Sequence, residues 1–261
     1  MSILIQSEIE KLKKIDMNLE DYYHKSNEIL KALLDSNDIY TVVSRETTVE
    51  ELSNNEGKVF FGLNNNIPTM WLFSQDDIAN EYAEYYQHKV KNKNLIRKIE
   101  FEELLIVSYF AMLSGVAQVI IDEGRSYLVC NICDLVNECF KKHGQPPVLE
   151  REEYPIINVI NSVRFSHNRL WVVSSENTAK SDKSFMPINH NNSFKVFTNK
   201  SDSEKYSKEN NYATVKINIS ELKNILVSAL NNNIENVEFV IANEVANIRV
   251  NKLFNLLERM N

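Results

Sequence analysis

The sequence predicts an α+β protein: two tandem copies of a mixed β-sheet domain with packed helices, preceded by an N-terminal helix. Three observations indicate this. The chain has 261 residues, which suits two domains of about 130 residues each. Hydrophobic residues make up 43% of it and charged residues 25%, as in a folded globular protein. Short apolar strands and amphipathic helices recur in the same order in both halves.

The N-terminal segment, residues 1–24, is expected to form an amphipathic helix with no counterpart in the second half. One face of this helix carries four apolar side chains at helical spacing: Ile5, Ile9, Leu12 and Ile15. An apolar helix face can pair with a second copy of itself. One hypothesis is therefore a homo-oligomer formed through this helix.

The first copy is expected to span residues 25–143 and to read α-β-β-β-α-β-α-β-β-α. The apolar spacing predicts helices over residues 26–35, 75–88, 102–114 and from Asn131 onward. It predicts strands over residues 41–44, 59–65, 68–74, 95–101, 116–122 and 126–130. Asn131 is a favoured residue type for a helix N-cap.

The second copy is expected to span residues 144–261, after a seam at residues 143–147 where Gly and Pro stop the preceding helix. The predicted helices cover residues 155–165, 202–209, 220–230 and from Asn251 onward. The predicted strands cover residues 171–174, 184–190, 193–198, 212–219, 237–242 and 246–250. The polar segment 175–184 is expected to be a mobile loop within this copy.

Serine residues are expected to begin several of these helices. Ser74 with Asp77 has the spacing of a capping box, and so has Ser201 with Glu204. Ser220 is expected to cap the helix over residues 220–230.

A strand that ends in Phe-Ser or Phe-Thr and leads into an acidic helix occurs in both halves, at Trp71–Ser74 and at Val196–Thr198. Together with the strands Val119–Asp122 and Phe239–Ala242, this arrangement resembles the SseB N-terminal domain family of bacterial proteins. The resemblance covers most of residues 38–140 and 168–258. It implies a tandem pair of such domains, and it implies no enzymatic activity for any residue of this chain.

The charge and cysteine content restrict the partner and the compartment. The formal net charge is −7, whereas a nucleic-acid-binding domain normally carries a basic face, so nucleic acid is not the expected partner. Three cysteines are too few for a disulfide framework and suit a reducing compartment. The sequence has neither a signal-peptide pattern at its start nor an apolar run of about 20 residues, so no membrane is expected and a cytoplasmic location is predicted.

Two short motifs resemble catalytic ones, but the sequence favours structural roles for both. Cys130 and Cys133 have CxxC spacing, yet free cysteine commonly behaves as a small buried hydrophobe. Ser220 and Lys223 spell SxxK, without the further motifs that serine acyl-enzymes need. Lys223 is expected to face solvent.

No other residues form a recognisable catalytic or metal-binding set. The basic run Lys89–Lys98 is interpreted as a solvated connection or a protein-docking patch. The histidines lack metal-ligand spacing and are expected on the surface: His24, His88, His143, His167 and His190. The sequence therefore predicts no enzyme, no cofactor and no metal.

Aromatic residues supply the best candidate interface. Tyr82, Tyr85 and Tyr86 lie on one acidic helix, and three tyrosines within five positions cannot all face the sheet. Tyrosine is enriched at protein interfaces, so these three residues are the predicted protein-binding site. Trp71 and Trp171 lie in predicted strands and are expected in the core.

Two function hypotheses follow. The first is a non-enzymatic bacterial protein-binding module, such as an immunity or secretion-accessory protein that binds a basic effector or toxin. The alternative is a small-molecule enzyme or sensor with its site between the two copies, because domain junctions commonly hold ligands.

Overall fold

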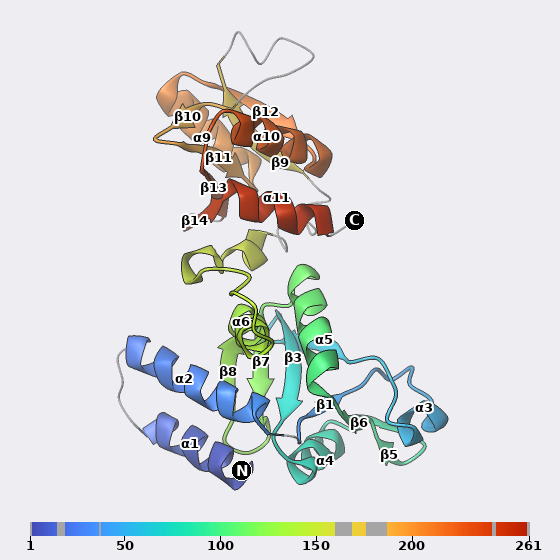
Figure 1. Cartoon of the computed structure of the whole chain (residues 1–261). Coiled ribbons are helices and arrows are strands. Elements are labelled where there is room, and N and C mark those ends of the chain that lie inside the picture. Colours follow the sequence, from blue (N-terminus) through green and yellow to red (C-terminus); the bar gives the residue numbers. More distant parts are fainter. Residues whose placement is uncertain are drawn as a thin grey trace. The chain divides into compact units, whose positions relative to one another are not determined.

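The computed structural model describes residues 2–14, 19–36, 38–159, 169–175, 187–241 and 244–259. The chain divides into two compact units, of which the first comprises Met1–Met112 with Val116–Val148 and the second Leu113–Gly115 with Leu149–Asn261. Each unit has a mixed sheet with packed helices (Figure 1), so the chain is α+β, as predicted.

The first unit is built on a sheet of strand order β6-β1-β3-β7-β8, with β2 paired to β3. β3 and β7 run parallel, and every other pair in this sheet is antiparallel. The strands are β1 (Tyr40–Val42), β2 (Phe61–Asn64), β3 (Ile67–Phe73), β6 (Ile96–Lys98), β7 (Gln118–Ile121) and β8 (Leu128–Asn131). The parallel pair requires a long crossover, which contains α4 (Asp76–Tyr85) and α5 (Phe101–Leu113).

One face of the first sheet forms an apolar core with α4. Trp71 and Phe73 of β3 and Ile120 of β7 are buried there against Ile78 and Tyr82 of the helix. Met70 and Leu72 alternate with these residues along β3 and are also buried, so both faces of this central strand are covered.

The N-terminal segment forms two helices, so the single helix expected over residues 1–24 is wrong. α1 covers Ser2–Lys14, and residues 19–24 belong to α2 (Leu19–Leu34). The apolar side chains of α1 that the structure describes, Ile5, Ile9 and Leu12, are buried, and α1 contacts α2. A homo-oligomer would therefore need another surface than this helix face. Ile15 lies outside the described residues.

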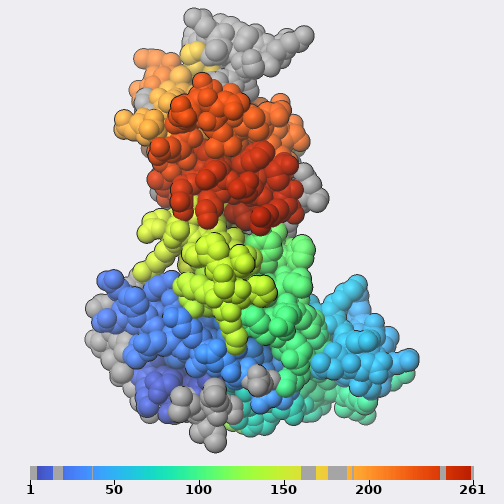
Figure 2. Space-filling model, in the orientation of Figure 1, coloured from blue at the N-terminus to red at the C-terminus, as the bar shows by residue number. Residues whose placement is uncertain are grey.

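α2 also packs beside α6 (Ile132–Lys142), and Figure 2 shows the two helices side by side, in blue and yellow-green. The Lys142 ammonium donates to the Leu34 carbonyl oxygen and lies 3.2 Å from an Asp35 carboxylate oxygen. A lysine at the end of one helix thus caps the free carbonyl end of the other. Asn131 caps α6, as predicted, because its side chain accepts from the Cys133 N–H.

The second unit has the strand order β12-β9-β11-β13-β14, with β10 paired to β11. Its only parallel pair among the described strands is β11 with β13. The strands are β9 (Leu170–Ser174), β10 (Asn189–His190), β11 (Ser193–Phe197), β12 (Ala213–Ile217), β13 (Asn236–Ile241) and β14 (Glu244–Arg249). Strand order and pairing directions match those of the first sheet. That the units descend from a duplicated domain stays a prediction.

The second unit also holds the helices η1 (Arg151–Glu153), α9 (Lys200–Asn210), α10 (Ile219–Asn231) and α11 (Val250–Arg259). The loop expected over 175–184 lies outside the described residues beyond Ser175, as does most of the helix expected over 155–165. Trp171 is only half-buried, unlike the buried Trp71.

Asparagine replaces glycine in the turns of both units. Asn65 and Asn66 join β2 to β3 with φ angles of 50° and 66°, and Asn191 and Asn192 join β10 to β11 with 50° and 59°. Two successive left-handed residues give the turn that matches the twist of a hairpin, and asparagine tolerates this conformation better than most residues. A chain with five glycines can therefore still form tight hairpins.

The predicted serine caps are wrong. Gln75 precedes α4 without a side-chain cap, Asn199 caps α9, and Asn218 caps α10 in a capping box with Glu221. Ser220 lies inside α10. Ser74 instead donates hydrogen bonds from its backbone N–H and its hydroxyl to the Asp122 carboxylate.

Asp122 joins three segments of the first unit. Its carboxylate accepts from the backbone N–H and the hydroxyl of Ser74, each at 2.7 Å, and from the Gln6 amide of α1 at 2.7 Å. Asp122 directly follows β7 and Ser74 directly follows β3, so the bonds join the carboxyl ends of the parallel strands. Burial raises the pKa of Asp122, and these hydrogen bonds oppose that rise.

We predict that Asp122→Asn destabilises the protein by about 2 kcal/mol, because the new amide group cannot accept from all three donors. Asparagine suits the backbone, since φ at this position is 59°. Gln6→Ala removes one donor only and should cost about 1 kcal/mol. Urea unfolding measures both. An Asp122→Asn protein as stable as the wild type would contradict this role.

Candidate functional site

The three predicted interface tyrosines lie at the end of α4 with very different exposure. Tyr82 is 7% exposed, Tyr86 is 46% exposed and Tyr85 is 80% exposed. Tyr82 therefore belongs to the core, whereas Tyr85 and Tyr86 are available at the surface.

The rings form a continuous row from the core to the surface. Tyr82 packs against Phe73 at 5.2 Å between ring centroids and against Tyr86 at 4.5 Å. The Tyr85 ring stands edge-on to Tyr86 at 4.9 Å. Burial and the nearby Glu123 carboxylate raise the pKa values of Tyr82 and Tyr86 above the ordinary value for a phenol. The ring contacts with the buried Tyr82 therefore hold the exposed rings of Tyr85 and Tyr86 in place.

Glu123 lies beside this row, directly after Asp122. Its carboxylate accepts from the Tyr86 hydroxyl at 3.1 Å and from the Trp71 indole N–H. Both donors are neutral. No ion pair joins Glu123 to a cation within the part of the chain that the structure describes, so its negative charge is held in place without being neutralised.

Arg125 supports α4 from the same loop. Its guanidinium donates to both carboxylate oxygens of Glu81, at 2.9 and 2.5 Å, and to Asp77 at 3.0 Å. This two-pronged geometry suits a planar guanidinium and fixes the loop against the helix. Arg125 therefore pairs with Asp77 and Glu81 and does not form an ion pair with Glu123.

A hollow of about 450 Å³ opens between α4 and this loop. We call it the tyrosine hollow, and its lining residues are Glu81, Tyr82, Tyr85, Tyr86, Glu123, Gly124, Arg125 and Tyr127. Gly124 has a φ of 110°, which disfavours any residue with a side chain. One lining ring already makes a cation–π contact within the chain, because the Lys13 ammonium lies 3.9 Å from the Tyr127 ring centroid.

This arrangement can bind a positively charged side chain. Aromatic rings attract a cation to their faces, and a nearby carboxylate adds a charge of opposite sign. The first turn of α4 is acidic at Asp76 and Asp77, and Glu81 and Glu84 follow on a helix without basic residues. Asp77 and Glu81 pair with Arg125, however, and Glu84 pairs with Lys89, so within the hollow it is the Glu123 carboxylate that attracts a basic ligand.

Sequence reasoning did not find Glu123 and Arg125. The available signal was their position directly after a strand of the central parallel pair, where polar residues of α/β sheets commonly form sites. The pairing of β3 with β7 was needed to see that this loop meets α4.

The cysteines are structural, as the sequence favoured. Cys130, Cys133 and Cys139 are free and buried. Burial raises the pKa of all three thiols, that of Cys139 to about 12, so the reactive thiolate is disfavoured. None of these residues contributes to the tyrosine hollow.

Other sequence expectations need correction. Lys223 does not face solvent freely: its side chain is mostly buried and lies 3.1 Å from the Glu258 carboxylate. In the basic run Lys89–Lys98, Lys89 pairs with Glu84 and the buried Arg97 pairs with Glu103. Lys98 pairs with Asp38, so three of the five cations of this run have a carboxylate partner.

Among the histidines, His24 and His143 are exposed as expected, but His88 is buried. Its Nε2–H donates to the Val43 carbonyl oxygen at 2.7 Å. His167 and the side chain of His190 lie outside the described residues. Over the described ranges no group of three potential metal ligands occurs, and none of the described helices has the length and apolar character to cross a membrane.

Comparison with known proteins gives no family. No family model matches the chain, and no curated protein matches it. One solved structure, that of Anabaena Tic22, described as a protein of protein transport, aligns with 82% of this chain and 92% of its own at 13% identity. The TM-score is 0.22, and at that value the likeness carries no conclusion about this chain.

We predict that His88 makes stability depend on pH. Burial lowers its pKa below the ordinary value of 6.5, so the unfolded chain takes up a proton before the folded protein does. The free energy of unfolding should therefore fall as pH drops below about 6.5, until the lowered pKa is reached. Urea unfolding of wild type and His88→Gln over this range measures the difference.

His143→Gln, which changes an exposed histidine, is the matched control. A wild-type protein and a His88→Gln variant with parallel pH profiles would show that His88 is not held neutral by the fold.

Proposed function

We propose that this chain is a non-enzymatic protein-binding module and that the tyrosine hollow of its first unit docks a basic segment of another protein. The observation that carries the proposal is the combination of the exposed rings of Tyr85 and Tyr86 with the unneutralised carboxylate of Glu123. A lysine or arginine side chain entering the hollow would contact the rings and reach this carboxylate.

The energetics suit a reversible contact. A cation over an aromatic ring contributes about 0.5–1 kcal/mol at an exposed site and about 2 kcal/mol where water is excluded. The net charge of −7 attracts a basic partner over a longer range and raises the association rate, an effect that salt weakens. The rigid rings would provide specificity, and the overall charge would raise the association rate.

The class of partner follows from the charge. A basic effector or toxin fits, with this chain as an immunity or secretion-accessory protein. Membership of the SseB-like family, as a tandem pair of domains, is part of the same proposal and rests on the sequence resemblance alone. A cytoplasmic location is proposed because all three cysteines are free thiols.

Binding of a labelled lysine-rich peptide, followed by fluorescence anisotropy, tests the proposal. We predict that Glu123→Gln weakens binding about tenfold, because the amide loses the charge, while its oxygen can still accept from the Trp71 N–H and its NH2 group can donate to the Tyr86 hydroxyl oxygen. Tyr85→Ala should weaken binding about threefold, in keeping with one exposed cation–π contact.

Matched controls are Glu56→Gln and Phe110→Ala, which change an exposed acid and an exposed aromatic residue outside the lining of the hollow. Both should bind the peptide as the wild type does. Equal binding of an aspartate-rich peptide, or peptide binding unaffected by Glu123→Gln, would refute docking at this site.

A further inference from the structure

A second feature, independent of the tyrosine hollow, lies on the sheet of the second unit. The two sheets have the same strand order, so their registers define corresponding positions. β1 pairs with β3 through Tyr40 and Phe73, and β9 pairs with β11 through Trp171 and Phe197. Trp71 lies two residues before Phe73 on β3, and Lys195 lies two residues before Phe197 on β11, so Trp71 and Lys195 occupy corresponding positions.

The correspondence extends across the sheet as a row of three direct neighbours. In the first sheet the row is Trp71, Ile120 and Val129; in the second it is Lys195, Glu238 and Asn247. The first row belongs to the apolar core beneath α4. The second row is polar throughout, at positions where the same topology elsewhere in the chain places a core.

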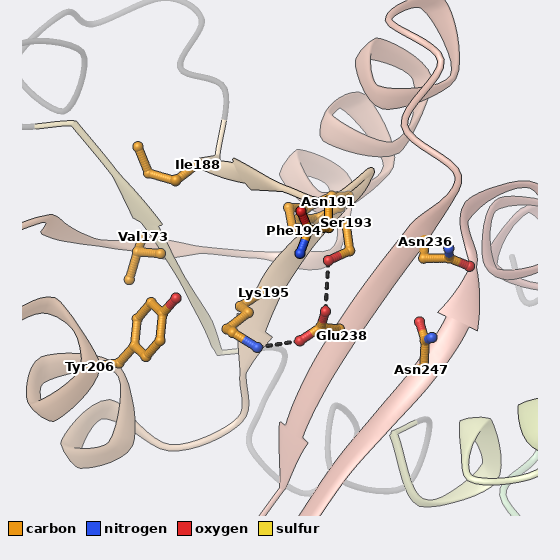
Figure 3. A pocket seen from close by; sticks show the side chains of 10 residues that line it. All are labelled: Val173, Ile188, Asn191, Ser193, Phe194, Lys195, Tyr206, Asn236, Glu238 and Asn247. Atoms are coloured by element: carbon orange, nitrogen blue, oxygen red, sulfur yellow. Dashed lines mark hydrogen bonds and ion pairs between the residues drawn. The ribbon is translucent and has the colours of Figure 1, made fainter. Parts of the chain in front are cut away.

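These polar residues form a network (Figure 3). The Ser193 hydroxyl donates to one Glu238 carboxylate oxygen at 2.6 Å, and the Lys195 ammonium pairs with the other oxygen. The side chains of Lys195 and Glu238 are only 24% and 25% exposed. The ammonium also lies 5.7 Å from the ring centroid of Tyr206 on α9.

The helix over this part of the second sheet is polar as well. α9 buries Ser203 and Ser207, whose hydroxyls lie 3.3 and 2.7 Å from the Thr214 hydroxyl of β12. α9 contacts β9, β11 and β12. A cavity of about 270 Å³ remains beside Tyr206 and above the Lys195–Glu238 pair. We call it the Lys195 pocket.

Stability gives little reason for this composition. Removing two charges from water is costly, and replacing a buried ion pair by apolar residues of similar size is often neutral or stabilising. The first sheet shows that this strand arrangement accepts apolar residues in the row. The polar row therefore needs an explanation other than stability.

We infer that the Lys195 pocket binds a small neutral polyhydroxylated molecule of monosaccharide size. Lys195 and Glu238 neutralise each other, which favours a neutral ligand over an anion or a cation. The amides of Asn191, Asn236 and Asn247 add donors and acceptors, and each sugar hydroxyl can use both.

The size and walls of the pocket agree with this class. Pockets for drug-sized ligands measure about 300–1,000 Å³, so a cavity of about 270 Å³ suits a smaller molecule. Val173, Ile188 and the Tyr206 ring supply apolar wall opposite the polar groups, and the C–H face of a sugar ring can pack there.

The test measures binding of ribose, glucose and galactose to the full chain by isothermal titration calorimetry, with inorganic phosphate as the anionic probe and glycine as the zwitterionic probe. At least one sugar should bind. The double variant Lys195→Met/Glu238→Leu should lose that binding about tenfold or more, because the hydrogen-bonding groups are gone, while its Tm equals or exceeds that of the wild type.

The pair Lys200 and Glu204 on the exposed face of α9 supplies the matched control, since Lys200→Met/Glu204→Leu should leave sugar binding unchanged. Ser193→Ala is a milder variant and should weaken binding about threefold. The proposal is overturned if no sugar binds, if only phosphate or glycine binds, if binding survives the first double variant, or if that variant unfolds.

Discussion

The Asp122 carboxylate is the interaction on which the first unit depends. It joins the carboxyl ends of β3 and β7 and holds α1 through Gln6. Its buried position makes every donor matter, because an unpaired polar group there would cost more than a surface hydrogen bond contributes. Glu123 and Arg125 follow in the chain, so the same contact fixes the loop that meets the tyrosines of α4.

The two units show how one strand order can hold two different interiors. In the first sheet an apolar row packs under α4, and the polar groups lie beyond the strand ends, in the loop after β7. In the second sheet the polar groups lie within the row itself, beneath the Ser-rich α9. Backbone hydrogen bonding fixes the strand order, while the side chains on one face decide whether that face is a core or a pocket.

Much of the fold follows from local sequence patterns. Alternating apolar residues and the Asn-Asn turns predict the strands and hairpins, and apolar spacing predicts α5, α6 and α10 to within a few residues. Helix starts are less predictable, because a serine can serve a distant group. Ser74 binds Asp122, which lies 48 positions away in the sequence, instead of capping α4. His88 was misjudged for the same reason, since its partner Val43 belongs to another strand region.

The sites depend even more on long-range pairing. The exposure of one tyrosine on α4 was predictable from helical spacing, but Glu123 joins the site only through the pairing of β3 with β7. Lys195 and Glu238 lie on strands that are far apart in sequence, and either residue alone reads as an ordinary surface charge. Only the register brings them together.

The central claim is that a cationic side chain reaches Glu123 in the tyrosine hollow. Trp71 donates to that carboxylate and is one of two tryptophans in the chain. In a Trp171→Phe variant its fluorescence reports on this group alone. Docking at Glu123 predicts that a lysine-rich peptide shifts the Trp71 emission and that Glu123→Gln abolishes the shift. An emission spectrum unchanged at saturating peptide would contradict it.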